Sequence, residues 1–170
     1  PDDANFYFDR GVAKYCLKDY QGAIEDYDQA IAINPDHPNF YFERGVAKCE
    51  VEDYQGAIED CNQAIAINPE DARYYNNLGA AKSWLKDYQG AIEDCNQAIS
   101  INPDDANFYN DRGNAKRGLG DKEGAIADYS QAISINPQYD APRQNLRRII
   151  KSAAITERFG VSAVLLLGTF

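Results

Sequence analysis

The chain repeats itself every 34 residues, and no other feature of its sequence restricts the fold as strongly. A second shared pattern precedes each copy of the first, so every unit holds two stretches of helical length joined by a short polar turn. Periods of about 20 to 50 residues indicate stacked helix pairs, each in contact only with its neighbours. The four copies of the first pattern are DYQGAIEDYDQAIAINP (19–35), DYQGAIEDCNQAIAINP (53–69), DYQGAIEDCNQAISINP (87–103) and DKEGAIADYSQAISINP (121–137).

The spacing of apolar residues in these copies predicts helices. In the first copy Ala23, Ile24, Tyr27, Ala30 and Ile31 recur every three or four residues and therefore share one stripe of a helix. An Asn-Pro pair closes each copy, because proline lacks a backbone donor and disfavours helical geometry in the residue before it. These pairs lie at 34–35, 68–69, 102–103 and 136–137.

A glycine recurs in the middle of the other predicted helix of each unit. Glycine there costs about 1 kcal/mol relative to alanine, so a close approach of two helices is the expected gain. We expect the glycines at 11, 45, 79 and 113 to face small partners, namely Ala23, Ala57, Ala91 and Ala125.

The charge excludes several classes of partner. Acids outnumber bases 27 to 17, and a net charge of −10 repels phosphate backbones and anionic lipid head groups. We therefore expect no nucleic acid partner, and the charge disfavours a membrane as a partner. Residues 140–170 differ from the rest, since they contain five bases against two acids and leave −13 on residues 1–139.

The sequence offers no residues from which to build a metal or catalytic site. The four cysteines (16, 49, 61 and 95) form no C-x-x-C pair, and His37 is the only imidazole. No metal, no cofactor and no enzymatic activity are expected, because a nucleophile with an adjacent base is missing. The cysteine spacings follow the repeat rather than a disulfide framework, which favours buried or groove-lining thiols and a reducing, cytoplasmic location.

The chain resembles the tetratricopeptide repeat (TPR) family over about residues 4–139. The family pattern of an aromatic residue, Gly, Ala, an aromatic residue, Ala and Pro recurs in each unit, with Cys61 and Cys95 replacing the second aromatic residue in two of them. In the first unit the pattern falls on Tyr7, Gly11, Ala23, Tyr27, Ala30 and Pro35.

The resemblance implies an all-α fold, a right-handed α-solenoid of helix-turn-helix repeats (an α-α superhelix). It implies repeats at 4–37, 38–71, 72–105 and 106–139, a capping helix at 140–159 and an apolar tail at 160–170.

Two positions depart from the family pattern. Lysines stand at 14, 48, 82 and 116, where the family usually has tyrosine, and Arg10, Arg44 and Arg112 stand where it usually has leucine; the third repeat keeps Leu78. We expect each arginine to lie over aromatic rings and to pair with an acid. The candidate acids are Asp26, Asp60 and Asp128.

In proteins of this kind the first helix of each pair lines a concave groove that receives a peptide. The positions that share the groove side of these helices change from apolar in the first two repeats to amide-rich in the last two, whereas the packing positions barely change. The predicted groove residues are Asn5, Phe8, Val12, Tyr15, Asn39, Phe42, Val46, Arg73, Asn76, Asn77, Ala80, Trp84, Asn107, Asn110, Asn114 and Arg117.

Two interpretations of this side remain open. In the first, Phe8, Val12, Tyr15, Phe42 and Val46 form an exposed apolar patch of the kind that marks interaction sites, and the asparagines bond to a peptide backbone. In the second, Phe8 and Phe42 pack against adjacent helices.

One branch of the family grips the paired carboxylates of a chaperone tail with a lysine and an asparagine one turn apart, a second asparagine and two further bases. The corresponding positions here hold Phe8, Val12, Glu43, Arg73 and Asn77. Because only one base and some amides remain, we expect no tight binding of such a tail.

The segment after the last repeat has the pattern of a capping helix. Pro142 can occupy its first turn, and Leu146, Ile149, Ile150 and Ala153 recur with helical spacing. Solenoids need such a helix to cover their last apolar face. Its polar side carries Arg143, Arg147, Arg148 and Lys151.

Residues 160–170 carry no charge and admit three interpretations. In the first, the capping helix extends through these residues and packs on the last repeat. In the second, the residues insert into a groove, either that of their own molecule or that of a neighbouring molecule, where they meet Phe8 and Phe42; insertion into a neighbour forms a homo-oligomer. In the third, they begin a membrane span. Eleven residues are too few for a span, which needs about 20.

The leading functional hypothesis is a scaffold or adaptor that binds a peptide or helical segment of a partner protein in its groove. The alternative is a self-associating structural protein, in which the apolar tail docks on a neighbouring molecule or leads to a membrane anchor.

Overall fold

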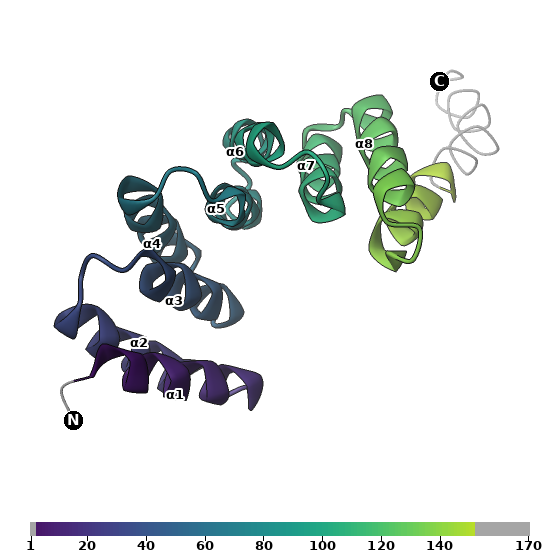
Figure 1. Ribbon diagram of the computed structural model, residues 1–170. Coiled ribbons are helices and arrows are strands. Elements are labelled where there is room, and N and C mark those ends of the chain that lie inside the picture. The colour runs from purple at the N-terminus through teal and green to yellow at the C-terminus, as the bar shows by residue number, and fades with distance from the viewer. Residues whose placement is uncertain (1–2, 152–170) are drawn as a thin grey trace, which may run out of the picture. The chain divides into compact units, whose positions relative to one another are not determined.

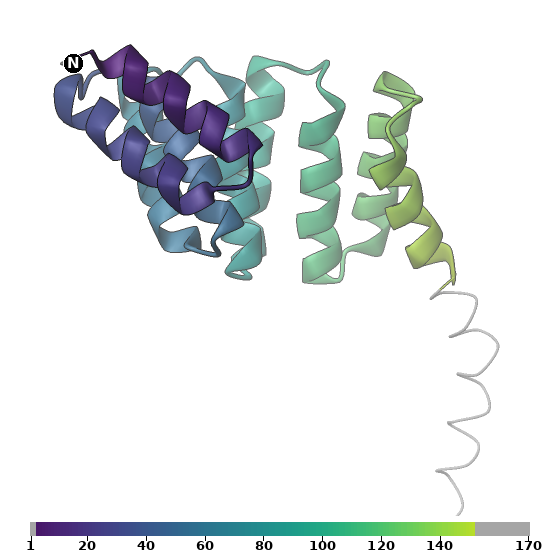
Figure 2. The same ribbon diagram turned by 90° about the horizontal axis from the view of Figure 1, so that it is seen from below.

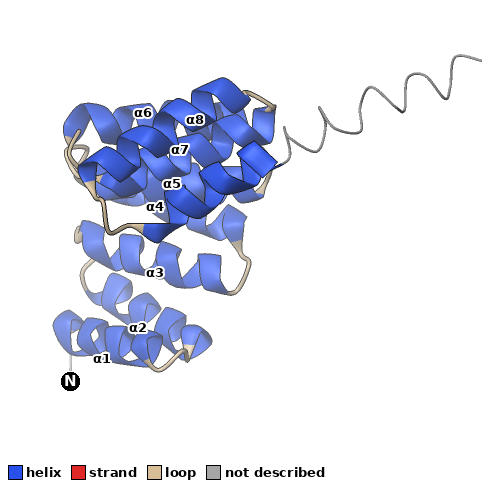
Figure 3. Ribbon diagram, turned by 90° about the vertical axis from the view of Figure 1, so that its right-hand side faces the viewer, coloured by secondary structure: helices blue, strands red, loops and turns tan. Residues whose placement is uncertain are grey.

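The computed structural model describes residues 3–151, and this part of the chain contains helices and turns but no strand (Figure 3). The prediction of an all-α solenoid of helical repeats is confirmed. A further helical stretch covers residues 140–151. The helices before it are α1 (Ala4–Cys16), α2 (Tyr20–Ile33), α3 (Pro38–Glu50), α4 (Tyr54–Ile67), α5 (Ala72–Trp84), α6 (Tyr88–Ile101), α7 (Ala106–Leu119) and α8 (Lys122–Ile135).

The chain divides into two compact units between Asp104 and Asp105. The first unit holds α1 to α6 as three helix pairs (Figure 1). In it α2 packs on α3 and α4 packs on α5, while α1 contacts α3 and α3 contacts α5. The first helices of the three repeats therefore form a continuous row within this unit.

The second unit holds the pair α7 and α8 and the helix at 140–151, which lies beside α8 (Figure 2). Ile149 joins Ala125 and Tyr129 in a buried cluster, and Leu146 packs against that cluster. These contacts cover the apolar side of the last repeat. The remainder of the predicted capping helix and the apolar tail at 160–170 lie outside the described residues.

Aspartates and Asn-Pro pairs set the helix ends. The second helices begin after an aspartate whose carboxylate accepts a hydrogen bond from the glycine three residues on; Asp19 Oδ1, for example, lies 3.0 Å from Gly22 N. Such a cap satisfies a backbone donor that the helix leaves unpaired. At the other end, each second helix stops directly before its Asn-Pro pair, which confirms the predicted stop signals.

The mid-helix glycines do mark a close approach, but the partner differs from the prediction in two repeats. A Cβ on Gly11 would lie 2.7 Å from Cε1 of Tyr27, and Gly113 stands in the same relation to Tyr129. In the second repeat, a Cβ on Gly45 would lie 3.3 Å from the Cβ of Asp60. In the first and fourth repeats the nearest atoms therefore belong to a fully buried tyrosine ring and not to the predicted alanine.

Gly11→Ala and Gly45→Ala provide a matched test of this difference within one unit. Overpacking against the buried ring costs about 1–3 kcal/mol, so Gly11→Ala should lower the free energy of unfolding even after the gain of about 1 kcal/mol in helix propensity. Gly45→Ala should be neutral or slightly stabilising. Urea unfolding followed by circular dichroism measures both, and equal effects would contradict the assignment.

A buried carboxylate joins the two helices of the first, second and fourth pairs. Asp26, on α2, accepts two hydrogen bonds from the Arg10 guanidinium (2.8 and 2.5 Å) and forms an ion pair with Lys14 (2.9 Å). The Arg10 guanidinium also lies 5.3 Å from the centre of the Tyr7 ring. Arg44 and Arg112 pair in the same way with Asp60 and Asp128, so the expected pairing of the arginines with acids and rings is confirmed.

The third repeat lacks this arginine and its aspartate has a different electrostatic environment. Leu78 replaces the arginine, and Asp94 keeps only Lys82, at 2.7 Å, as an ion-pair partner among the described residues. Burial raises the pKa of Asp94, whereas the bonds from Arg10 lower the pKa of Asp26. Equivalent aspartates therefore respond to pH in opposite directions.

Asp26→Asn and Asp94→Asn should differ in cost and in pH dependence. At neutral pH we expect Asp26→Asn to lower the free energy of unfolding by about 2–3 kcal/mol, because it leaves Arg10 and Lys14 without their carboxylate, and Asp94→Asn to cost about 1 kcal/mol or less.

The sign of each pH effect follows from linkage. The lowered pKa of Asp26 stabilises the fold above the pKa of the unfolded chain, about 3.9, and this stabilisation is lost as the pH falls. The raised pKa of Asp94 stabilises the fold below that value, and this stabilisation is lost as the pH rises. Urea titrations between about pH 7 and pH 2 should therefore show the cost of Asp26→Asn shrinking, and that of Asp94→Asn growing, as the solution is acidified. The same trend for both variants would contradict this account.

Candidate functional site

The first helices of the first unit form one surface that contains most of the predicted groove residues. Side chains 35 residues apart connect neighbouring helices: Tyr15 Oη donates to Glu50 Oε1 (3.3 Å), and Tyr74 Oη donates to Asn39 Oδ1 (2.7 Å). We call this surface the first-helix face. It consists of Asn5, Phe8, Val12 and Tyr15 on α1, Asn39, Phe42 and Val46 on α3, and Arg73, Asn76, Asn77, Ala80 and Trp84 on α5.

The apolar side chains of this face are half-buried. The Phe8 ring lies 5.1 Å from the Phe40 ring and 5.8 Å from the Tyr27 ring, between centres. Val12 and Tyr15 pack on the core cluster beneath them. The predicted exposed patch is therefore wrong in its degree of exposure, because the neighbouring helix covers part of each side chain.

Phe42 shows the same arrangement one repeat further along. Its ring centre lies 5.2 Å from that of Tyr74, and the Arg73 guanidinium lies 5.1 Å from it. The interpretation that Phe8 and Phe42 pack against adjacent helices is confirmed. Each is only half-buried, however, so part of its surface remains in contact with solvent.

Three of the four asparagines of this face have side-chain partners inside the protein. Asn77 Nδ2 donates to Cys61 Sγ (3.3 Å), and Asn39 Oδ1 accepts from Tyr74. Asn76 Oδ1 lies 3.9 Å from Cys95 Sγ. These contacts fix the first helix of one repeat against its neighbours, which is a role that the sequence pattern did not reveal.

Three members of the face are well exposed: Asn5, Arg73 and Trp84. The Arg73 guanidinium is held by Asp71, whose pKa it lowers, with 2.6 Å between Nη2 and Oδ2. Trp84 is 67% exposed and stacks on Tyr54, with ring centres 5.6 Å apart and planes 10° from parallel. An indole that is held parallel to another ring and is open to solvent offers a flat apolar surface to a partner.

In the fourth repeat the predicted ligand contacts are used by the chain itself. Asn145 Nδ2 donates to Asn110 Oδ1 (3.2 Å) and to Asn114 Oδ1 (3.1 Å), and Tyr129 Oη also donates to Asn114 (3.0 Å). Asn110 is only 4% exposed. The prediction that Asn110 offers its amide to a bound peptide is therefore wrong, and the oxygen of Asn114 already accepts two hydrogen bonds.

The physical reason is the helix at 140–151. Asn145 follows Asn110 by 35 residues, the same spacing that separates Asn39 from Tyr74. The helix therefore lies where the first helix of a further repeat would pack. The two remaining predicted residues of α7, Asn107 and Arg117, are exposed; Asn107 bonds to Asp105 (2.8 Å) and Arg117 bonds to Asn145 (3.2 Å).

All four cysteines are free thiols in the structure. Cys61 and Cys95 are buried where two other repeats have tyrosine, and burial raises the pKa of Cys61 to about 12. Cys49 is half-buried and Cys16 is exposed. Within residues 3–151 no group of His, Cys, Asp or Glu side chains has an arrangement that could hold a metal ion, and none of the helices found there is long and apolar enough to cross a membrane.

Comparison with protein families matches almost the whole repeat region. A family model described as "Tetratricopeptide repeat" matches residues 72–105 and 106–139, and one described as "TPR repeat" matches residues 14–51 and 47–82. No curated protein matches the chain.

Several solved structures are similar. That of MamA protein has a TM-score of 0.76 and 24% identity, with 91% of this chain and 85% of that chain covered. YrrB, described as a TPR protein with an unusual peptide-binding site, has a TM-score of 0.76 and 16% identity, with 86% and 75% covered. The first TPR of Spaghetti (RPAP3), bound to the HSP90 peptide SRMEEVD, has a TM-score of 0.65 and 26% identity, with 69% and 93% covered. Because the family models together span residues 14–139 and the helices follow the same 34-residue period, the chain belongs to the tetratricopeptide repeat family.

Proposed function

We propose that the chain is a protein-interaction scaffold whose first-helix face binds a peptide segment of a partner protein. One observation carries the proposal. The face combines half-buried apolar side chains on α1 and α3 with the exposed Arg73 and Trp84 on α5, on three helices that contact each other in sequence. A partly covered apolar row with a few exposed polar and aromatic groups is the usual composition of a peptide-binding surface.

Variation between the repeats supports this choice of face. The core position occupied by Ala23 is alanine in all four repeats and fully buried in each. The position of Val12, in contrast, is Val, Val, Ala and Asn in the successive repeats. If these positions served packing alone, the same residue type would be favoured in every repeat. Residues that change from repeat to repeat along the first-helix face instead suit a ligand whose own residues change along its length.

The proposal concerns the first unit only. In the fourth repeat, the helix at 140–151 takes up the hydrogen-bonding capacity of Asn110 and part of that of Asn114. The first-helix face of the first unit has its apolar surface half-covered by neighbouring helices and keeps the remainder for a partner. The similar RPAP3 domain binds a peptide, and we carry a peptide ligand over to this chain as part of the proposal.

The test is a peptide selected from a displayed library against the full chain, followed by measurement of its affinity for two matched double variants. Val12→Gln with Val46→Gln removes two aliphatic side chains from the first-helix face. We expect this double variant to bind the peptide at least about tenfold more weakly, since each substitution removes buried apolar contact with the peptide. Isothermal titration calorimetry measures the change, with melting temperatures to confirm that both variants are folded.

Ile33→Gln with Ile67→Gln is the control, because it makes the same kind of change in the same two repeats at exposed positions near the ends of α2 and α4. It should leave the affinity within about twofold of the parent. Equal weakening by the two double variants, or none by the first, would place the peptide elsewhere and refute the proposal.

The peptide SRMEEVD should not be a ligand at micromolar concentration. In the chaperone-binding branch, certain positions bind the carboxylates of the peptide, and in this chain three of them are Phe8, Val12 and Glu43. The one remaining base, Arg73, already forms an ion pair with Asp71. Burial raises the pKa of Glu43, and a carboxyl group at this position, unlike a base, offers no positive charge that would attract a carboxylate. Fluorescence anisotropy of the labelled peptide measures this, and a saturable titration would contradict the expectation.

A further inference from the structure

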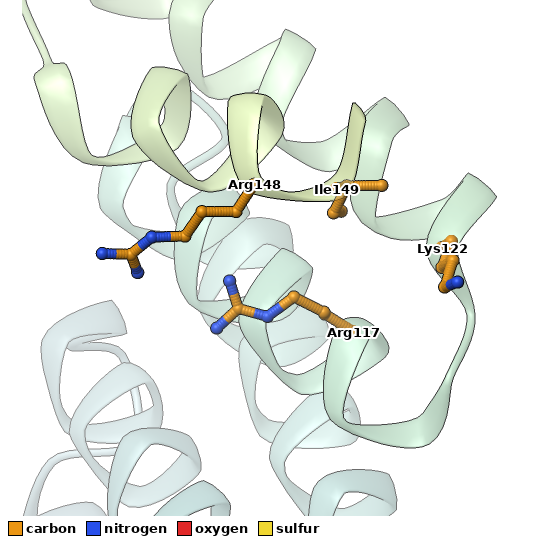
Figure 4. Close-up of a pocket in the computed structure, with 4 residues that line it drawn as sticks. All are labelled: Arg117, Lys122, Arg148 and Ile149. Carbon is orange, nitrogen blue, oxygen red and sulfur yellow. The ribbon is translucent and has the colours of Figure 1, made fainter. Parts of the chain in front are cut away.

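A cavity of about 300 Å³ opens in the second unit, and three of its lining side chains are cationic. Arg117 comes from the end of α7, Lys122 from the start of α8, and Arg148 from the helix at 140–151, with Ile149 beside it (Figure 4). In Figure 4 the side chains of Arg148 and Arg117, which come from different helices, extend toward the same side of the view, and Lys122 lies on the opposite side. The volume is at the small end of ligand-binding pockets.

The three cations lack the neutralisation that most other arginines receive. Arg10, Arg44, Arg73 and Arg112 each form an ion pair with an aspartate at 2.5 or 2.6 Å. Among residues 3–151, no carboxylate lies within 4 Å of the charged nitrogens of Arg117, Lys122 or Arg148. Like charges gathered around one cavity repel each other, so a bound anion would be favourable.

Buried hydrogen bonds hold part of this cluster in place. Arg117 Nη1 donates to Asn145 Oδ1 (3.2 Å), and the amide of Asn145, which is 8% exposed, is itself fixed by its bonds to Asn110 and Asn114. Arg148 and Ile149 follow Asn145 by three and four residues, so all three share one side of their helix. Arg117 and the helix that carries Arg148 are therefore held at the cavity by these contacts, which reduces the entropic cost of binding.

The acids nearest in sequence do not compensate the cluster. Asp121 and Glu123 flank Lys122 and are exposed. The Asp121 carboxylate accepts the backbone hydrogen bond of Gly124 (2.8 Å) as the cap of α8. The net charge of −10 opposes an approaching anion only weakly at physiological salt, where exposed charges are screened beyond about 8 Å. The local cluster thus determines which ligand the cavity prefers.

We propose that this cavity binds a phosphate monoester. A phosphate monoester carries between one and two negative charges at neutral pH and three acceptor oxygens, which match two planar guanidinium forks better than a single carboxylate does. The ester is carried either by a phosphorylated side chain of a partner peptide or by a small free molecule. This site lies in the second unit and is separate from the first-helix face.

The test uses the full chain and three probes: a short peptide with one phosphoserine, the same peptide without the phosphate, and free O-phosphoserine. Arg148→Gln removes one lining cation, and Arg147→Gln is the matched control, because it makes the same charge change at the adjacent exposed residue, which does not line the cavity. Both variants should melt within about 2 °C of the parent, as expected for surface substitutions. Binding is measured by calorimetry at low and at physiological salt.

We expect the phosphorylated probes to bind saturably and the unphosphorylated peptide not to bind. Arg148→Gln should weaken phosphate binding about tenfold or more, as for loss of a charge-assisted hydrogen bond, and Arg147→Gln by less than about twofold. Tighter binding of the phosphopeptide than of free O-phosphoserine would assign the site to a peptide, and equal binding would assign it to a small ester. No saturable binding of either phosphorylated probe at millimolar concentration, or equal weakening by the two variants, would overturn the proposal. The Val12 and Val46 double variant should bind phosphate normally, so failure of one proposal leaves the other intact.

Discussion

Each helix pair of this chain leaves one apolar face that only a following helix can cover, and the arrangement of each unit follows from this requirement. In the first unit, α3 covers the face left by α1 and α2, and α5 covers the next. After the fourth repeat the helix at 140–151 takes over the same task, with Ile149 in the buried cluster and Asn145 bonded to Asn110 at the 35-residue spacing used between repeats. The helix at 140–151 therefore packs as the first helix of a fifth repeat would, although its sequence does not follow the repeat pattern.

The charged residues inside the repeats complement this apolar packing by fixing how the helices pair. A buried aspartate that accepts two bonds from one arginine defines the relative position of both helices, because the guanidinium fork has a rigid geometry. Arg44 also reaches Asp28 of the preceding repeat at 2.6 Å, so a single side chain joins two repeats. The third repeat, with Leu78 in place of the arginine, shows that the fold tolerates the loss of one such pair. Buried ion pairs are weak evidence for stability, but their geometry specifies which helix faces which.

The sequence alone predicted what depends on local pattern and period. The helices end before their Asn-Pro pairs, and Arg10 pairs with Asp26, because both features follow from residues within one repeat. What it missed depends on contacts between repeats. The packing of Phe8 against Phe40, on the first helix of the next repeat, was one of two interpretations that the sequence left open. The hydrogen bond from Asn145 to Asn110 was missed, because Asn145 belongs to a segment outside the repeat pattern. The contact between Gly11 and Tyr27 was missed for a different reason, since the period places both residues without showing how deeply the ring reaches between the helices. The 35-residue spacing of Asn110 and Asn145 is the one signal that could have indicated the fourth-repeat contact in advance.

The position of the helix at 140–151 beside α7 and α8 has two consequences. By packing on α7 and α8 it removes Asn110 from solvent, which argues against the fourth repeat as part of a peptide-binding row. By the same packing it brings Arg148 to a cavity that already holds Arg117 and Lys122, so the covered end of the repeats gains a cluster of positive charge. Shielding the apolar surface requires Leu146 and Ile149, whereas position 148 is exposed on the polar side of this helix and accepts polar side chains of several kinds. The proposed phosphate site therefore gives Arg148 a role that packing alone does not require.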